Sequence, residues 1–298
     1  MRITLLILLF STISSCSSLG PVTWEKRVVD NYHLPRVNLF YTEKGKGQTL
    51  LLVHGLAESS YTWRYIIDDL AKNNHVIAVD LKGFGRSPKP RDALYSVYDQ
   101  ALAVHQLMQQ KNIKQATVIG HSFGGGVALA LAMMDKPSEH VKQLILIDAA
   151  AYPQELPSML RILQRPLLGV TGLYLMSPVI QAKKAYQYAF YDAEKIPSEG
   201  VNEASINLGK QGSRYALAQT VQQMIPDDLA DISKKYKLLS HRALIIWGEK
   251  DKIVLPENAH RLHKDIKNSQ LVFLEKVGHI PQEEAPKKIL NIIEKFIK

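Results

Sequence analysis

The stretch Gly120-His121-Ser122-Phe123-Gly124 decides how this chain folds, because it joins two segments of different character. Residues 116–119 before it are apolar and β-branched, as in a buried strand, and residues 125–134 after it are apolar and small. The pattern predicts a strand, a sharp turn and a helix, with Ser122 at the tip of the turn. The two glycines tolerate crowding that a Cβ atom would not. The serine hydroxyl would then stand at the N-terminus of a helix, where backbone N–H groups favour developing negative charge.

Strand and helix patterns alternate along most of the chain on both sides of this turn. Further buried strands are expected at 49–53, 75–79, 144–147, 243–247 and 271–274, and an early antiparallel hairpin at 37–41. Helices are expected at 63–71, 98–110, 258–265 and 283–297. Such alternation predicts an α/β fold with a mostly parallel central sheet flanked by helices.

The alternation stops between residues 151 and 240. This segment has no strand pattern, is rich in tyrosine, and is broken into short helical stretches by repeated prolines. An insertion that follows a strand lies over the sheet edge where ligands bind in open α/β folds. We therefore expect a core formed by 24–150 and 241–298, and a helical cap formed by 151–240. Apolar cap residues such as Leu173, Met176 or Phe190 are expected to set substrate choice.

A serine nucleophile needs a nearby base, and the base needs a carboxylate to fix its tautomer. Asp251 follows the strand at 243–247, and His279 follows the strand at 271–274. Both therefore sit on loops past strand ends, at the sheet edge that presents Ser122. We expect Ser122 as nucleophile, His279 as base and Asp251 as the orienting acid, with Asp148, which also ends a strand, as the alternative acid.

Other titratable residues fit structural roles better. His54 and Asp80 end strands and are expected to shape the loops that follow, while the direction of His121 is set by the turn itself. His260 and His263 have a spacing that suits a metal, but the sequence offers no third ligand, so neither a metal nor an organic cofactor is expected. An oxyanion needs two preorganised donors. We expect them to be the backbone N–H groups of Phe123, and of Leu56 in the loop after His54-Gly55.

Five motifs together resemble the successive signatures of the α/β-hydrolase superfamily. They are Leu52-Val53-His54-Gly55, Asp80-Leu81-Lys82-Gly83-Phe84-Gly85-Arg86-Ser87, Gly120-His121-Ser122-Phe123-Gly124-Gly125, Trp247-Gly248-Glu249-Lys250-Asp251 and Gly278-His279. The resemblance implies the α/β-hydrolase fold with an inserted helical cap. It is nearest to the capped serine esterases, lipases and carbon–carbon bond hydrolases. Related haloalkane dehalogenases and epoxide hydrolases carry aspartate at the turn, so Ser122 argues against both.

Ester hydrolysis is the activity expected from these residues, on a small molecule with an apolar acyl or aromatic group. The enzymatic alternative is carbon–carbon bond hydrolysis of a ring-cleavage product. Its substrate is anionic and would need cationic pocket residues, for which Arg161, Arg165 and Arg214 are the candidates. A binding protein that kept the fold without catalysis is disfavoured by the complete order of serine, aspartate and histidine.

Composition and the N-terminus indicate where the protein works. The formal net charge is +9, but the basic residues are scattered without interleaved aromatics, so a solvated surface is expected rather than a nucleic-acid site. Residues 1–15 have the charge and the short apolar stretch of a secretory signal. The sole cysteine, Cys16, follows directly, which resembles a bacterial lipoprotein signal. We expect a lipid on Cys16, a tether at 16–23, and a protein of the cell envelope anchored to a membrane.

Overall fold

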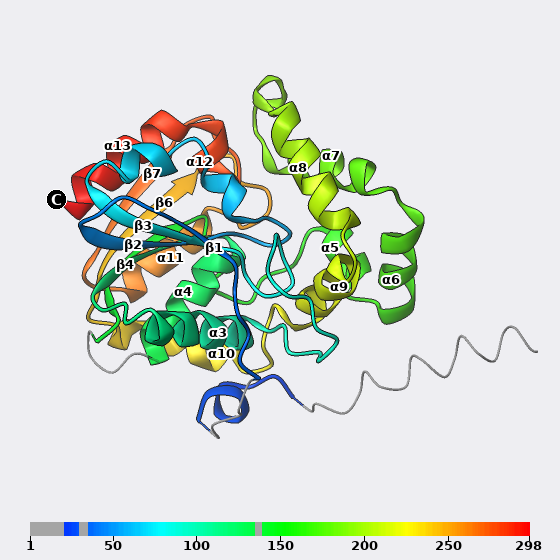
Figure 1. The fold of residues 1–298 in the computed structure, drawn as a ribbon, viewed down its shortest axis with the longest axis horizontal. Helices are drawn as coiled ribbons and strands as arrows, with labels where there is room; N and C mark the ends of the chain where they lie inside the picture. Colours follow the sequence, from blue (N-terminus) through cyan, green and yellow to red (C-terminus); the bar gives the residue numbers. More distant parts are fainter. Residues whose placement is uncertain (1–20, 30–34, 135–138) are drawn as a thin grey trace, which may run out of the picture.

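The computed structural model describes residues 21–29, 35–134 and 139–298, and it is built around one seven-stranded sheet (Figure 1). The strand order is β1-β3-β2-β4-β5-β6-β7, and every pairing except that of β1 with β3 is parallel. The strands are β1 (Tyr41–Lys44), β2 (Gln48–Val53), β3 (Asn74–Val79), β4 (Ala116–His121), β5 (Val141–Ile147), β6 (Arg242–Gly248) and β7 (Ser269–Leu274). The mostly parallel sheet expected from the alternation of patterns is confirmed.

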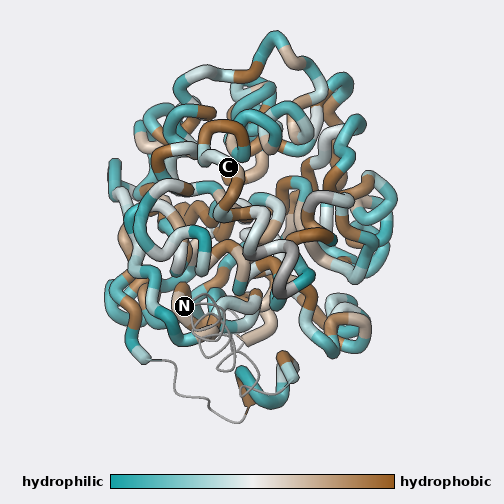
Figure 2. Tube along the Cα trace, turned by 90° about the vertical axis from the view of Figure 1, so that its right-hand side faces the viewer, coloured by the Kyte–Doolittle hydropathy of each residue, from teal (hydrophilic) through white to brown (hydrophobic). Residues whose placement is uncertain are grey.

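The inner strands form because their sequences are apolar on both faces, as parallel strands covered by helices require. Leu50 to Val53 of β2 and Leu144 to Ile147 of β5 have no exposed surface. Figure 2 shows the hydrophobic segments gathered in the interior of the tube trace. The core of the protein therefore lies on both sides of the sheet.

Helices cover the two faces of the sheet and form two apolar clusters with it. One face packs against α3 (Val97–Gln110), α4 (Phe123–Met134) and α11 (Glu257–Asp265). The other packs against η2 (Ser60–Trp63), α2 (Ile67–Leu70) and α13 (Pro286–Ile297), while α12 (Pro281–Glu284) precedes α13. The closing helix expected at 283–297 is divided at Ala285, because Pro286 has no N–H with which to continue α12.

The first strand differs from the expected hairpin at 37–41. It spans Tyr41–Lys44 and pairs antiparallel with β3, with Tyr41 opposite Val79, instead of pairing with β2. Both edges of β2 are occupied, by β3 on one side and by β4 on the other. The first strand can therefore join the sheet only at the free edge of β3.

The segment between β5 and β6 is helical, and most of it forms a group at one end of the sheet (Figure 1). No strand occurs within residues 151–240, all of which the structure describes. The helices of this group are α5 (Ser158–Leu163), α6 (Pro166–Leu175), α7 (Pro178–Ala189), η3 (Ala193–Lys195), α8 (Ser198–Gly209) and α9 (Ser213–Gln223). We call this group, residues 151–223, the cap.

The end of the inserted segment packs on the core instead of continuing the cap. Helices α10 (Leu229–Ile232) and η4 (Ser233–Leu238) contribute Ile232 and Tyr236 to the apolar cluster that holds α3 and α4. The hydroxyl of Tyr98 on α3 donates to Asp228 at 2.9 Å. The last part of the expected range 151–240 thus makes its own contacts with the core helices.

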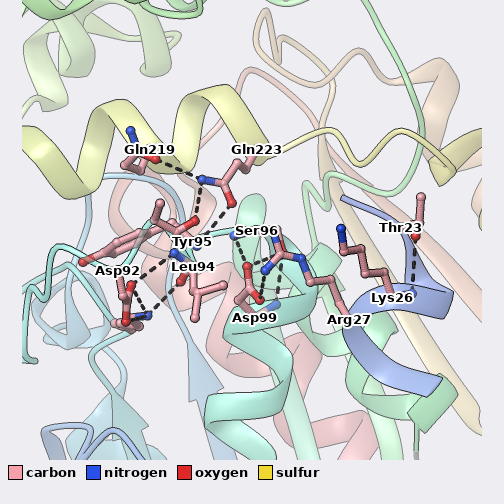
Figure 3. A network of polar contacts seen from close by, with 12 residues as sticks. Thr23, Lys26, Arg27, Asp92, Leu94, Tyr95, Ser96, Asp99, Gln219 and Gln223 are labelled. Atoms are coloured by element: carbon pink, nitrogen blue, oxygen red, sulfur yellow. Dashed lines mark hydrogen bonds and ion pairs between the residues drawn. The ribbon is translucent and has the colours of Figure 1, made fainter. Parts of the chain in front are cut away.

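The described N-terminal residues are docked on the core. Helix η1 (Glu25–Val29) packs on α3, and the N–H groups of Val22 and Trp24 donate to the carboxylates of Asp227 and Asp228 at 2.8 and 2.6 Å. Figure 3 shows Arg27 directed at Asp99, with an Nη1–Oδ1 distance of 3.4 Å. The part of the expected tether that is described, residues 21–23, thus ends in hydrogen-bonded contact with the core. The expected signal, 1–15, and Cys16 lie outside the described residues.

Candidate active site

Ser122 lies in a strained turn between β4 and α4. Its φ of 51° falls in the left-handed region, which residues with a side chain seldom adopt. Backbone hydrogen bonds hold it there, because its N–H donates to Ile147 and its carbonyl accepts from Gly125 and Ala150, each at 2.9 Å. A Cβ on Gly124 would come within 2.4 Å of the carbonyl oxygens of Val53 and His54. The turn therefore needs glycine at this position, as the motif predicts.

Ser122, His279 and Asp251 meet although they are far apart in sequence. The Nε2 of His279 is 2.8 Å from the Oγ of Ser122, and its Nδ1 is 2.7 Å from Oδ2 of Asp251. All three residues are buried. The other carboxylate oxygen of Asp251 accepts from the N–H groups of Ile253 and Val254, at 2.7 and 3.1 Å. The carboxylate is thereby fixed in place, and it in turn fixes the ring of the histidine.

Asp148, the alternative acid that the sequence offers, lies beside this pair and makes a different hydrogen bond. Its Oδ1 accepts from the N–H of Gly248 at 2.9 Å, and no hydrogen bond joins it to His279 in the described chain. Burial and the neighbouring Asp251 carboxylate raise the pKa of Asp148 well above its ordinary range. Because two close buried carboxyl groups repel each other when both are charged, these surroundings favour the neutral form of Asp148.

The two expected oxyanion donors remain available. In the described part of the chain, no hydrogen bond engages the N–H of Leu56 or that of Phe123, the first residue of α4. Leu56 lines the same cavity as Ser122, and the next residue, Ala57, has a φ of 61°. The loop after β2 and the nucleophile thus face one cavity.

The remaining candidates have structural partners. Asp80 accepts from the N–H groups of Ser60 and Arg86, at 2.6 and 2.8 Å, and so organises the loops expected of it. His54 donates from Nδ1 to its neighbour Gly55 and accepts the N–H of Leu81 at Nε2. His260 and His263 belong to no group of close metal-ligating atoms among the described residues. Such a group is formed by Asp148, Asp251 and His279, but both nitrogens of His279 already have partners.

A cavity of about 660 Å³ between the cap and the core opens onto Ser122 and His279. Leu173 and Met176 of the cap line it, whereas Phe190 packs behind it against Ile280. The carboxylates of the lining residues already have partners: Glu58 faces His121, Glu283 faces Arg64 at 2.9 Å, and Glu203 accepts from the side-chain amide of Asn207 at 3.1 Å. Apart from these groups the wall is mostly apolar.

Contacts between the cap and the loop of His279 were not expected from the sequence. The backbone N–H of His279 donates to the carbonyl of Ala189, the last residue of α7, at 2.7 Å. Glu284 accepts from the N–H groups of Gly278 and Asp192, at 2.6 and 2.8 Å. A Cβ on Gly278 would stand 2.2 Å from the oxygen of Ala189. The glycine before His279 was the one available signal of this close approach.

Comparisons with known proteins agree with the geometry. A sequence profile described as the alpha/beta hydrolase fold matches residues 48–286. The chain is 30% identical over 268 residues to the uncharacterized hydrolase YugF of Bacillus subtilis strain 168, covering 88% of this chain and 95% of that protein. It is 29% identical over 251 residues to Lipase 3 of Moraxella sp. strain TA144, covering 84% and 77%. The structure of the meta-cleavage product hydrolase CumD from Pseudomonas fluorescens IP01 matches with a TM-score of 0.74 at 25% identity, over 88% of this chain and 94% of that one.

Proposed function

Because the chain belongs to the alpha/beta hydrolase fold family and is a hydrolase of that kind, we propose that it cleaves carboxylic esters by a serine mechanism. The observation that carries the proposal is the approach of Ser122 Oγ to His279 Nε2, at 2.8 Å, beneath a mostly apolar cavity. The similarity to Lipase 3 supports the same reaction class.

The mechanism follows from the directions of the hydrogen bonds. Ser122 Oγ attacks the ester carbonyl carbon while its proton passes to His279 Nε2. Asp251 keeps the Nδ1–H of His279 in place and stabilises the imidazolium that forms. The N–H groups of Leu56 and Phe123 bind the oxyanion. His279 then gives its proton to the leaving alcohol, and a water molecule, activated by His279, releases the acid from Ser122.

The cavity favours a neutral ester with an apolar group over an anionic ring-cleavage product. The second candidate is carbon–carbon bond hydrolysis, because the chain is also similar to CumD and to the 2-hydroxymuconate semialdehyde hydrolase of Pseudomonas sp. strain CF600. However, Arg161, Arg165 and Arg214 are not among the residues that line the cavity, and of the described lining residues only Lys184 is cationic. A carboxylate substrate would instead meet Glu58, Glu203 and Glu283, and burying it without a cationic partner is costly.

Replacement of Ser122 by alanine tests the mechanism. We expect hydrolysis of p-nitrophenyl esters to fall by about 10⁶-fold, the loss typical of a serine protease without its nucleophile. Ser158→Ala is a matched control, because Ser158 also lines the cavity but contacts no member of the triad. Near-normal turnover in Ser122→Ala, or equal losses in both variants, would contradict the proposal. A series of acyl lengths, run beside a dienone substrate, separates the two reaction classes.

We also propose that Cys16 carries acyl chains that hold the protein at a membrane of the cell envelope. The support is the signal-like sequence that ends at the sole cysteine. No helix in the described ranges, which begin at residue 21, is long and apolar enough to span a bilayer. Mass spectrometry of the mature protein should find acyl groups on an N-terminal Cys16, and Cys16→Ser should lose them. An unmodified N-terminus beyond Cys16 would overturn this proposal.

A further inference from the structure

His121, beside the nucleophile, faces two hydrogen-bond acceptors. The ring is fully buried, with no exposed surface. Its Nε2 lies 2.7 Å from the backbone oxygen of His279, and its Nδ1 lies 3.1 Å from Oε2 of Glu58. The residue thus touches the loop of the base on one side and the loop that carries Leu56 on the other.

A neutral histidine ring cannot satisfy both contacts, because it has one donor nitrogen and one acceptor nitrogen. A backbone carbonyl only accepts, so Nε2 of His121 must carry hydrogen. Oε2 of Glu58 already accepts the N–H of Gly55 at 2.8 Å, as a carboxylate does. Burial opposes the charge on Glu58, but the charge and hydrogen bond of His121 and the Gly55 N–H outweigh it, so the pKa of Glu58 is lowered. Nδ1 of His121 must therefore donate as well.

The other two histidines of the site have no such requirement. His279 faces the hydroxyl of Ser122 at Nε2, and a hydroxyl can donate to that nitrogen. His54 accepts the N–H of Leu81 at Nε2, at 2.9 Å. A neutral ring with hydrogen on Nδ1 satisfies each of them. The partners of His279 therefore allow a neutral ring that can act as a base, whereas the partners of His121 require a ring that donates from both nitrogens.

We propose that His121 is a lasting imidazolium paired with Glu58, and that this buried ion pair is a positioning device for catalysis. Through Glu58 it fixes Gly55, and hence the Leu56 N–H proposed to bind the oxyanion. Through the carbonyl of His279 it fixes the loop of the base. The ring of His121 thereby connects the turn of Ser122, the loop that carries Leu56 and the loop that carries His279. The catalytic part of this inference rests on the proposed function, whereas the charge on His121 does not.

The charges that face His121 favour its protonated form. Burial opposes the charge, but the negative charge of Glu58, its hydrogen bond, the His279 carbonyl and the more distant Asp251 outweigh burial and raise the pKa of His121 above 6.5. Two other titratable rings face it: that of His54, which directly follows β2 and opposes the charge, and that of His279, whose ring centroid lies 5.0 Å from that of His121. Because the pKa is raised in the folded state, the stability gained is complete below 6.5 and is lost as pH rises through the raised value.

Nitrogen NMR of the full-length protein with ¹⁵N-labelled histidine tests the charge directly. The His121→Asn variant identifies the two ring signals by their disappearance. At about pH 7.5, one unit above the ordinary value for histidine, both ring nitrogens of His121 should carry hydrogen. A single protonated nitrogen in the wild-type protein would overturn the inference. This measurement needs no ester substrate, so it tests the charge on His121 independently of the proposed function.

The Glu58→Gln variant tests the partner and the positioning role. His121 should lose its second proton at the same pH, and kcat should fall by about 10- to 100-fold with less change in KM, since a whole oxyanion donor is worth about 10²–10³-fold. Glu43→Gln is the matched control, because it removes the carboxylate of a surface pair with His75 and should leave both readouts unchanged. A His121 that stays doubly protonated in Glu58→Gln, or one that loses its proton with no change in kcat, would contradict the positioning role.

Discussion

Ser122 presents its hydroxyl from a backbone conformation that costs about 1–3 kcal/mol for a residue with a side chain. The surrounding hydrogen bonds and the close packing of Gly124 on Val53 impose this conformation. Such crowding requires glycine at fixed positions a few residues from Ser122, so the turn could be predicted from the sequence alone. The contact of His121 with Glu58 could not, because it joins loops 63 residues apart and leaves no local pattern.

At the same scale, the acid of the triad can be assigned by paired substitutions. Asp251→Asn should lower kcat by about 10⁴-fold, the loss found when a serine protease triad loses the carboxylate that sets the histidine tautomer. Asp148→Asn should cost far less, because an amide oxygen can still accept the N–H of Gly248 and because burial and the Asp251 carboxylate raise the pKa of Asp148, which favours its neutral form. Steady-state kinetics of both variants on one ester gives the comparison. A larger loss in Asp148→Asn would reverse the assignment.

At the scale of elements, the spacing of apolar residues predicted which strands and helices exist. It was a poorer guide to which elements pair or pack together. The inner strands are continuous apolar runs, and β2, β4, β5 and β6 each contain the expected range and extend beyond it at one or both ends. β1 has no such run, and its place beside β3 depends on which sheet edge is free. The placement of α10 and η4 likewise depends on tertiary contacts, because Ile232 and Tyr236 pack in the cluster that holds α3 and α4.

Two cap residues should have different effects on catalysis. Leu173 lines the cavity, so Leu173→Ala should enlarge it and shift the preference toward longer acyl chains by about 10-fold, the effect of a methylene or two in an apolar pocket. Phe190 follows α7 and packs against Ile280 next to His279, so Phe190→Ala should lower kcat for all chain lengths alike. The measurement is kcat/KM over a series of p-nitrophenyl esters. A change of length preference in Phe190→Ala but not in Leu173→Ala would mean that the cavity wall is assigned wrongly.

At the scale of the whole molecule, residues 21–29 are the part of the chain that lies between the proposed lipid site at Cys16 and the hydrolase core. The sequence from 16 to 23 has the small polar residues of a tether, and composition gave no sign that its end is docked. The docking depends on Asp227 and Asp228, which lie about two hundred positions away, and on the burial of Arg27 beside Asp99. Asp99 also caps α3 through Ser96, so the segment is fixed to a core helix (Figure 3).

The buried pair of Arg27 and Asp99 makes the docking dependent on pH. Arg27→Ala leaves the carboxylate of Asp99 without its cation, and breaking a buried pair typically costs about 3–5 kcal/mol of unfolding free energy. Burial raises the pKa of Asp99 above its ordinary value, against the opposing charge of Arg27. As pH falls through that raised value Asp99 becomes neutral and needs no cation, so the loss should shrink as the pH is lowered from about 8. Denaturant unfolding at a series of pH values measures this change. Lys44→Ala, which removes an exposed ion pair, is the control and should cost less than about 1 kcal/mol of unfolding free energy. A loss in Arg27→Ala that is small, or that grows toward low pH, would mean that the pair does not hold the segment to the core.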